Sequence, residues 1–144
     1  MKIYRVAQFT NHIENVYDED GNIDDSVYSQ SQDLSKVVNI GITRDRELSD
    51  VINRDGKVVG ALWKSFEGGN YEFDIAVHPS YQNQGIGSEL VDKAISDFSE
   101  YKDMDDNATM RVHVISSVMQ KLLESRGFRV IERYGNDLIM ERVK

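Results

Sequence analysis

Two closely spaced glycines follow an apolar stretch in the middle of the chain, in the order Gln82-Asn83-Gln84-Gly85-Ile86-Gly87. Apolar side chains then recur three and four positions apart from Leu90 to Phe98, which predicts the buried face of a helix. The first turn of a helix leaves backbone N–H groups unpaired and carries partial positive charge. Glycines before such a turn let a phosphate approach the backbone. The spacing predicts a diphosphate cradle, and an ordinary strand-to-helix turn stays open as the alternative.

Two familiar phosphate motifs do not fit this spacing. A dinucleotide fingerprint that begins at Gly85 needs its third glycine at position 90, which is Leu90. A Walker loop needs Gly-Lys followed by Ser or Thr, and this stretch contains no such sequence. The pattern that remains is Gln-x-x-Gly-x-Gly.

The element that must position this loop is a strand predicted over residues 71–77. Its apolar side chains, Tyr71, Phe73, Ile75 and Val77, alternate with Glu72, Asp74 and Ala76. This period of two is typical of a strand with one buried face. Pro79 is the only proline in the chain and is expected to end the strand, because it lacks a backbone donor.

The strand, Pro79 and the loop together resemble the acetyl-CoA signature of the GNAT superfamily of N-acetyltransferases, which that family writes as Arg/Gln-x-x-Gly-x-Gly/Ala. The similarity runs from Ile75 to Gly87 and is closest to the bacterial enzymes that acetylate the N-termini of ribosomal proteins. Residues 122–128 also resemble the family's second motif, in which a helix ends in Gly-Phe. The resemblance implies an acyltransferase that moves the acetyl group of acetyl-CoA directly to a primary amine of a small molecule, protein or peptide.

The other elements are predicted from the same periodicities. Strands are expected at residues 2–8, 47–54, 57–66, 108–115, 128–133 and 137–142. Regularity is lost after the first strand, a helix is expected within 24–38, and residues 101–107 read as a polar loop. Ser116 and Ser117 can cap a further helix that stops at Gly127. This order predicts an α/β fold with a mixed, mostly antiparallel central sheet and flanking helices, as in GNAT proteins, in one domain over residues 1–144.

The resemblance also assigns cofactor-binding roles. Backbone groups of Ile75, Ala76 and Val77 would hold the pantetheine arm, and the Val77 amide would stabilise the oxyanion. The diphosphate would be held by the loop residues Asn83, Gln84, Gly85, Ile86, Gly87 and Ser88, and Gln82 is a further cofactor-binding candidate. Ser116 is the last cofactor-binding candidate, where related enzymes carry an asparagine.

Direct transfer to an amine needs a general base, because an ammonium has no lone pair. Glu72 and His113 are the candidates, and their alternatives are a solvated strand residue and a hydrogen-bonded core imidazole. Leu123 stands where related enzymes carry a tyrosine that protonates the departing thiolate. Tyr134 could take over the role of that tyrosine, and its alternative is a residue that serves only in packing. Leu123 and Ser116 keep a second function open, a non-catalytic acyl-CoA-binding sensor or assembly module.

Composition limits the partners. The 144 residues carry a net charge of −8, which disfavours nucleic acid and either favours an amine-bearing acceptor or only keeps an acidic protein dispersed. The chain has no cysteine, no apolar run long enough for a membrane helix and no signal-peptide pattern, so a cytoplasmic enzyme is expected. Asp18, Asp20 and Asn22 do not match a calcium loop, because Gly21 is fourth and not sixth, so no metal is expected. A homodimer stays possible.

Overall fold

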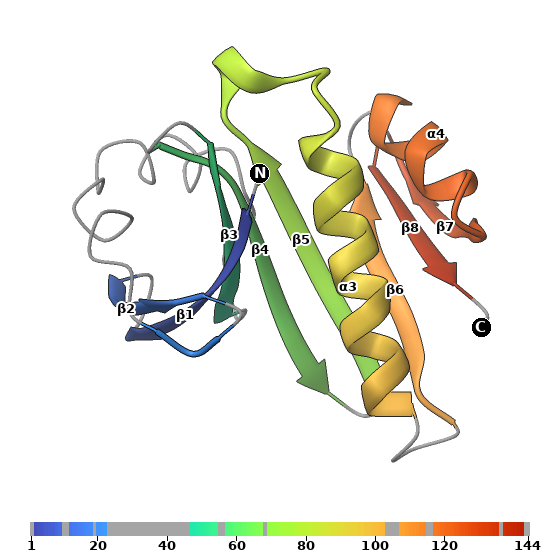
Figure 1. Ribbon diagram of the computed structural model, residues 1–144. Helices are drawn as coiled ribbons and strands as arrows, with labels where there is room; N and C mark the ends of the chain where they lie inside the picture. Colours follow the sequence, from blue (N-terminus) through green and yellow to red (C-terminus); the bar gives the residue numbers. More distant parts are fainter. Residues whose placement is uncertain are drawn as a thin grey trace. The chain divides into compact units, whose positions relative to one another are not determined.

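We describe the fold from a computed structural model of the chain, whose strands and helices form a mixed α/β fold (Figure 1). The structure describes residues 2–9, 12–18, 20–22, 47–54, 57–67, 69–102, 107–114, 117–135 and 137–142. These group into two compact units, which are described in turn: the first comprises Met1–Lys64 and Asp74–Leu90, and the second Ser65–Phe73 and Val91–Lys144. The single domain expected from chain length stays a prediction.

Four strands of the first unit pair antiparallel in the order β2-β1-β3-β4. Their bounds are Lys2–Phe9 for β1, His12–Tyr17 for β2, Glu47–Arg54 for β3 and Lys57–Glu67 for β4, which runs on into the second unit. The predicted strands at 2–8, 47–54 and 57–66 are confirmed.

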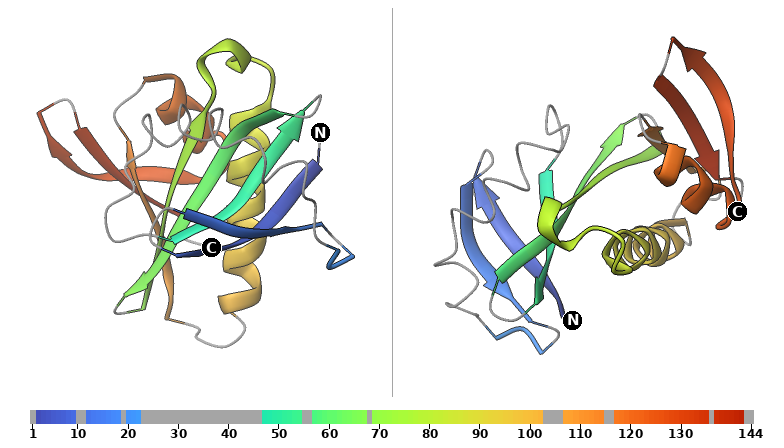
Figure 2. Two further views of the ribbon diagram at one scale, coloured as in Figure 1. Left: turned by 90° about the vertical axis from the view of Figure 1, so that its left-hand side faces the viewer. Right: turned by 90° about the horizontal axis from the view of Figure 1, so that it is seen from above.

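β2 is a strand that the sequence prediction missed. It lies beside β1, as the two views of Figure 2 show. The register between them shifts at Ala7/Gln8, so that Val16 lies opposite Val6 and Ile13 opposite Gln8. A strand opposite such an irregularity does not show strict apolar alternation, so the period of two is lost from its sequence. The helix predicted within 24–38 lies outside the described residues.

The core of the first unit lies along β3 and β4, where apolar residues are buried on both faces. Trp63 is 0% exposed and lies in this core. The other buried apolar residues of these two strands in this unit are Leu48, Val51, Ile52, Val58, Val59, Ala61 and Leu62. Burial of both faces explains why these strands read as continuous apolar runs.

The second unit contains strands in the order β5-β6-β8-β7. Their bounds are Asn70–Val77 for β5, which continues into the first unit, Thr109–Val114 for β6, Phe128–Tyr134 for β7 and Asp137–Arg142 for β8. β5 pairs parallel with β6, and the other pairs are antiparallel. The predicted strands at the end of the chain are confirmed, and β7 and β8 pair as an antiparallel hairpin (Figure 2).

Two helices complete the described structure, α3 over Ile86–Lys102 and α4 over Ser117–Glu124 (Figure 1). The sequence placed Tyr101 and Lys102 in a loop, but both extend α3. Tyr101 stacks on Phe66 with ring centroids 3.6 Å apart, and this contact stabilises the last turn despite its polar sequence. Neither of these helices has an apolar stretch of the length that a bilayer crossing needs.

An aromatic cluster around Tyr71 forms the core of the second unit. The ring centroid of Tyr71 lies 5.0 Å from that of Phe66, 5.9 Å from that of Phe98 and 6.3 Å from that of Phe73. Phe73 in turn lies 6.0 Å from Phe128 in an edge-to-face arrangement. The N-terminal half of β5 therefore has the buried apolar face that its alternation predicts.

The C-terminal half of β5 departs from that prediction. Asp74 is 5% exposed and Ala76 is 3% exposed, whereas Ile75 and Val77 are only part-buried. A period of two predicts burial correctly only when the polar face of the strand meets solvent. Here the face that carries Asp74 and Ala76 is buried instead. The expected burial of Ile75 and Val77 with Tyr71 and Phe73 was therefore wrong for this half.

Candidate active site

The chain leaves β5 through a short turn that is held by hydrogen bonds. The His78 backbone N–H donates to the Val59 carbonyl oxygen over 2.7 Å, and a 3-10 turn follows at Pro79–Tyr81. The buried His78 ring accepts a hydrogen bond at Nδ1 from the Ser80 N–H over 3.1 Å. This turn confirms the prediction that Pro79 ends the strand, and it fixes where the following loop begins.

The loop of residues 82–85, hereafter the glycine loop, is exposed throughout. Asn83 has φ of 63° and Gly85 has φ of 81°, both in the left-handed region that glycine and asparagine tolerate best. α3 begins directly afterwards at Ile86, and the Glu89 N–H donates to the Gly85 carbonyl oxygen over 3.1 Å. An exposed loop therefore opens onto a helix N-terminus, as the sequence predicts.

The members of the predicted cradle differ in exposure. Ile86 is 1% exposed, so only its backbone could meet a ligand. Gly87 and Ser88 lie within the first turn of α3, where N–H groups have no partner inside the helix. Anion binding by this segment would therefore rest on backbone N–H groups.

Gly60 lets β4 approach the start of α3, and the sequence prediction did not single it out. A Cβ on Gly60 would lie 2.7 Å from Cγ2 of Ile86 and 3.1 Å from Cδ1 of Leu90. The sequence did contain a signal for this contact, because an isolated glycine inside an apolar strand often marks a place where another element approaches the backbone closely.

Residues proposed to hold the pantetheine arm lie at the end of β5. The parallel ladder of β5 and β6 runs from Asn70 opposite Thr109 to Phe73 opposite Val112. The peptide groups of Ile75, Ala76 and Val77 follow this ladder, beyond its last pair. This position is compatible with their predicted backbone role, which stays a prediction.

Glu72 and His113, the two candidate bases, lie in the second unit beside charged groups. Glu72 is opposite Arg111 in the β5–β6 ladder, and Arg111 Nε lies 2.9 Å from Oε2 of Glu141 on β8. His113 Nε2 lies 3.4 Å from Oδ2 of Asp137, although this contact lacks hydrogen-bond geometry. Glu72 is therefore opposite an arginine that is itself paired with a carboxylate, whereas His113 lies near a carboxylate.

Tyr134, the candidate acid, is 62% exposed at the end of β7. Its hydroxyl donates to Oε2 of Glu132 over 2.7 Å. This hydrogen bond and the negative charge of Glu132 raise the pKa of Tyr134 above its ordinary value of 10.0. A hydroxyl held protonated in this way is a weaker acid, and its catalytic role stays a prediction.

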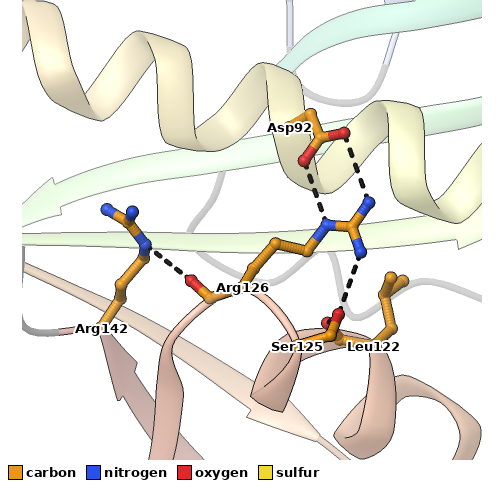
Figure 3. Close-up of polar contacts among 5 residues, drawn as sticks. All are labelled: Asp92, Leu122, Ser125, Arg126 and Arg142. Carbon is orange, nitrogen blue, oxygen red and sulfur yellow. Dashed lines mark hydrogen bonds and ion pairs between the residues drawn. The ribbon is translucent and has the colours of Figure 1, made fainter.

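Leu123, where related enzymes carry a tyrosine, is fully buried on α4. The end of α4 is secured by a polar cluster drawn in Figure 3. Arg126 lies 3.1 Å from Asp92 on α3 through Nε and also bonds Ser125, while Arg142 Nε donates to the Arg126 carbonyl oxygen over 2.8 Å. These contacts hold the end of α4 in place, and the Leu123 side chain lies in the core. Ser116 lies outside the described residues.

Comparison with known proteins identifies the family. Residues 47–130 match the family model of the acetyltransferase (GNAT) domain. The match covers more than half of the chain, and the chain belongs to this family of acyltransferases. No curated protein sequence gives a significant match.

Solved structures support the same fold. A ribosomal-protein-alanine N-acetyltransferase from Brucella melitensis is 21% identical, with a TM-score of 0.56 over 67% of this chain and 69% of that one. A ribosomal-protein-alanine N-acetyltransferase from Escherichia coli is also 21% identical, with a TM-score of 0.56 over 70% of each chain. The PaiA N-acetyltransferase from Thermoplasma acidophilum, in complex with coenzyme A, is 18% identical, with a TM-score of 0.54 over 78% of this chain and 68% of that one.

Proposed function

We propose that the protein is an N-acetyltransferase that moves the acetyl group of acetyl-CoA directly to a primary amine of a small molecule or of a protein or peptide. The observation that carries the proposal is the exposed glycine loop, which opens onto the N-terminus of α3. Membership of the acetyltransferase family and the coenzyme A complex of the similar PaiA structure support acetyl-CoA as the co-substrate.

Binding would use backbone groups. The N–H groups of the glycine loop and of the first turn of α3 would bind the diphosphate of acetyl-CoA, which supplies the acetyl group as a thioester. The peptide groups of Ile75, Ala76 and Val77 would hold the pantetheine arm. The Val77 N–H would then donate to the thioester oxygen, where negative charge develops during attack by the amine.

His113 is the base that we favour for removing the proton of the amine. An imidazole exchanges protons near neutral pH, and a carboxylate beside the ring can orient it. Asp137 lies at 3.4 Å in that position. Glu72 is the weaker candidate, because Arg111 opposite it would also attract the carboxylate.

Position 123 offers no hydroxyl group that could protonate the departing thiolate. Leu123 is buried and apolar, so CoA would leave as a thiolate or take its proton from another donor. A thiolate is a fair leaving group unaided. The CoA thiolate can therefore leave without a proton donor from the protein, and the absence of a tyrosine at position 123 does not argue against catalysis. For this reason we favour a catalytic protein over the non-catalytic acyl-CoA-binding module.

Two acceptor classes fit the chain. The fold similarity to ribosomal-protein-alanine N-acetyltransferases favours a protein N-terminus. The net charge of −8 equally favours a small polyamine-like molecule. A turnover screen that includes N-terminal peptides and polyamines distinguishes them.

A thermal-shift titration tests cofactor binding first. Acetyl-CoA and CoA should raise the melting temperature, and NAD and ATP should not. Saturation at 100 times the dissociation constant stabilises by about 2.7 kcal/mol. A folded sample that responds to none of these ligands would refute the proposed function.

The base is tested by turnover of His113→Gln and Glu72→Gln, each corrected for acetyl-CoA hydrolysis. We expect the histidine variant to lose roughly 10²- to 10⁴-fold in kcat, the range typical of a general base. The glutamate variant should retain most activity. Unchanged transfer in both variants would exclude both bases.

A further inference from the structure

We infer that Arg54 is a cofactor-binding residue whose guanidinium contacts the diphosphate of CoA at the glycine loop. The inference rests on the proposed function, because it adds a side chain to the same site. Arg54 is the last residue of β3, and one of its terminal nitrogens donates to Oε1 of Gln84, which lies 30 residues further along the chain. A cation from a separate strand is thus held at the loop.

The strand pairing explains why Arg54 reaches this loop. Arg54 lies opposite Lys57, where β4 begins, so it stands at the end of the β3–β4 pair. The chain leaves β5 beside the same end of β4, because the His78 N–H donates to the carbonyl oxygen of Val59. The glycine loop begins four residues after His78. The fold therefore delivers Arg54 and the loop to one end of the first unit.

The bonding of Arg54 suggests that its charge is available to a ligand. The protein carries a net charge of −8, and Arg111 and Arg126 pair with Glu141 and Asp92. Within the described ranges, by contrast, the only partner of the Arg54 side chain is the neutral amide of Gln84. No carboxylate there compensates its charge.

A guanidinium presents five N–H donors and binds phosphate oxygens in a two-pronged arrangement. One donor of Arg54 is engaged by Gln84, which leaves the others for a ligand. Gln84 then acts as a positioning residue, because its side-chain oxygen orients the arginine while the loop is exposed to an incoming ligand. The backbone N–H groups of the loop supply directional donors, and Arg54 supplies a full positive charge.

Calorimetric titration of CoA into the wild type, Arg54→Gln and Arg129→Gln tests this role. Arg129 is exposed on β7 and has no part in the proposed site, so its variant changes the net charge equally. We expect Arg54→Gln to raise the dissociation constant about tenfold, as for the loss of one charge-assisted contact. Arg129→Gln should stay within about twofold of the wild type, since distant exposed charges are screened by salt.

Two further arms sharpen the test. Dephospho-CoA keeps the diphosphate and lacks the 3′-phosphate, so Arg54→Gln should weaken its binding by the same factor. Arg54→Lys keeps the charge without the planar guanidinium and should recover part of the affinity. It also provides a folded variant if Arg54→Gln is unstable.

The failures can be told apart. Equal CoA affinity of Arg54→Gln and Arg129→Gln, with normal binding by the wild type, would overturn this inference alone. A loss seen with CoA but not with dephospho-CoA would overturn the assignment to the diphosphate. A folded wild type that does not bind CoA would overturn the proposed function, and this inference with it.

Discussion

The Cβ that Gly60 lacks would lie 2.7 Å from Cγ2 of Ile86, the first residue of α3. Real Cβ atoms do not approach other heavy atoms so closely, and Cγ2 is attached directly to the Cβ of a stiff, β-branched side chain. The same position would lie 3.5 Å from the Ala76 carbonyl oxygen on β5. A glycine on β4 thus sets how closely the helix that follows the glycine loop can pack.

Gly60→Ala should lower the free energy of unfolding by about 1–3 kcal/mol, the usual cost of overpacking a core. Denaturation in urea measures this loss. The double variant with Ile86→Ala should be less destabilised than the sum of the two single variants, because the truncated side chain no longer meets the added methyl group. Strict additivity would contradict the close approach.

Gly85→Ala should destabilise for a different reason. Gly85 has φ of 81°, and a Cβ there would meet nothing within 4 Å, so only the backbone conformation opposes a side chain. The expected cost is about 1–2 kcal/mol, with weaker CoA binding. Gly85→Asn should cost less, because asparagine tolerates this conformation. Equal losses for alanine and asparagine would contradict the explanation.

Leu123→Tyr should not restore a catalytic acid. Leu123 is 0% exposed, so the larger ring would overpack the core and destabilise the protein by about 1–3 kcal/mol. Val118→Tyr is the matched control on the same helix, because Val118 is 70% exposed and should accept tyrosine at little cost. Urea denaturation and kcat are measured together. A higher kcat without loss of stability would show that position 123 can reach the reacting thiolate.

Tyr134 should titrate above 10.0, because the hydrogen bond to Glu132 and the charge of that residue raise its pKa. A raised pKa in the folded state contributes stability below the unfolded pKa, and this contribution is lost as the pH rises through the folded value. Glu132→Gln should therefore lower the titration midpoint and weaken the loss of stability in alkali. Ultraviolet absorbance of tyrosinate measures the midpoint, and an unchanged midpoint in this variant would contradict the assignment.

Most elements of the described fold were predictable from local patterns. The apolar spacing from Leu90 to Phe98 indicated α3, and the alternation of Tyr71 and Phe73 indicated β5. Short-range geometry produces these periods, so they survive in the sequence. β2 was missed because its irregular pairing with β1 removes the alternation. The last turn of α3 was missed because Tyr101 is stabilised by Phe66, 35 positions earlier in the sequence.

The candidate site divides in the same way. The sequence by itself determined the glycine loop, since the spacing of Gly85 and Gly87 before a helical pattern is a local signal. Only the tertiary structure brought Arg54 to Gln84, placed Gly60 against Ile86 and put Asp137 beside His113. The reason is physical. Contacts between residues far apart in sequence depend on strand order and register, and these are decided by the packing of whole elements, which no local pattern records.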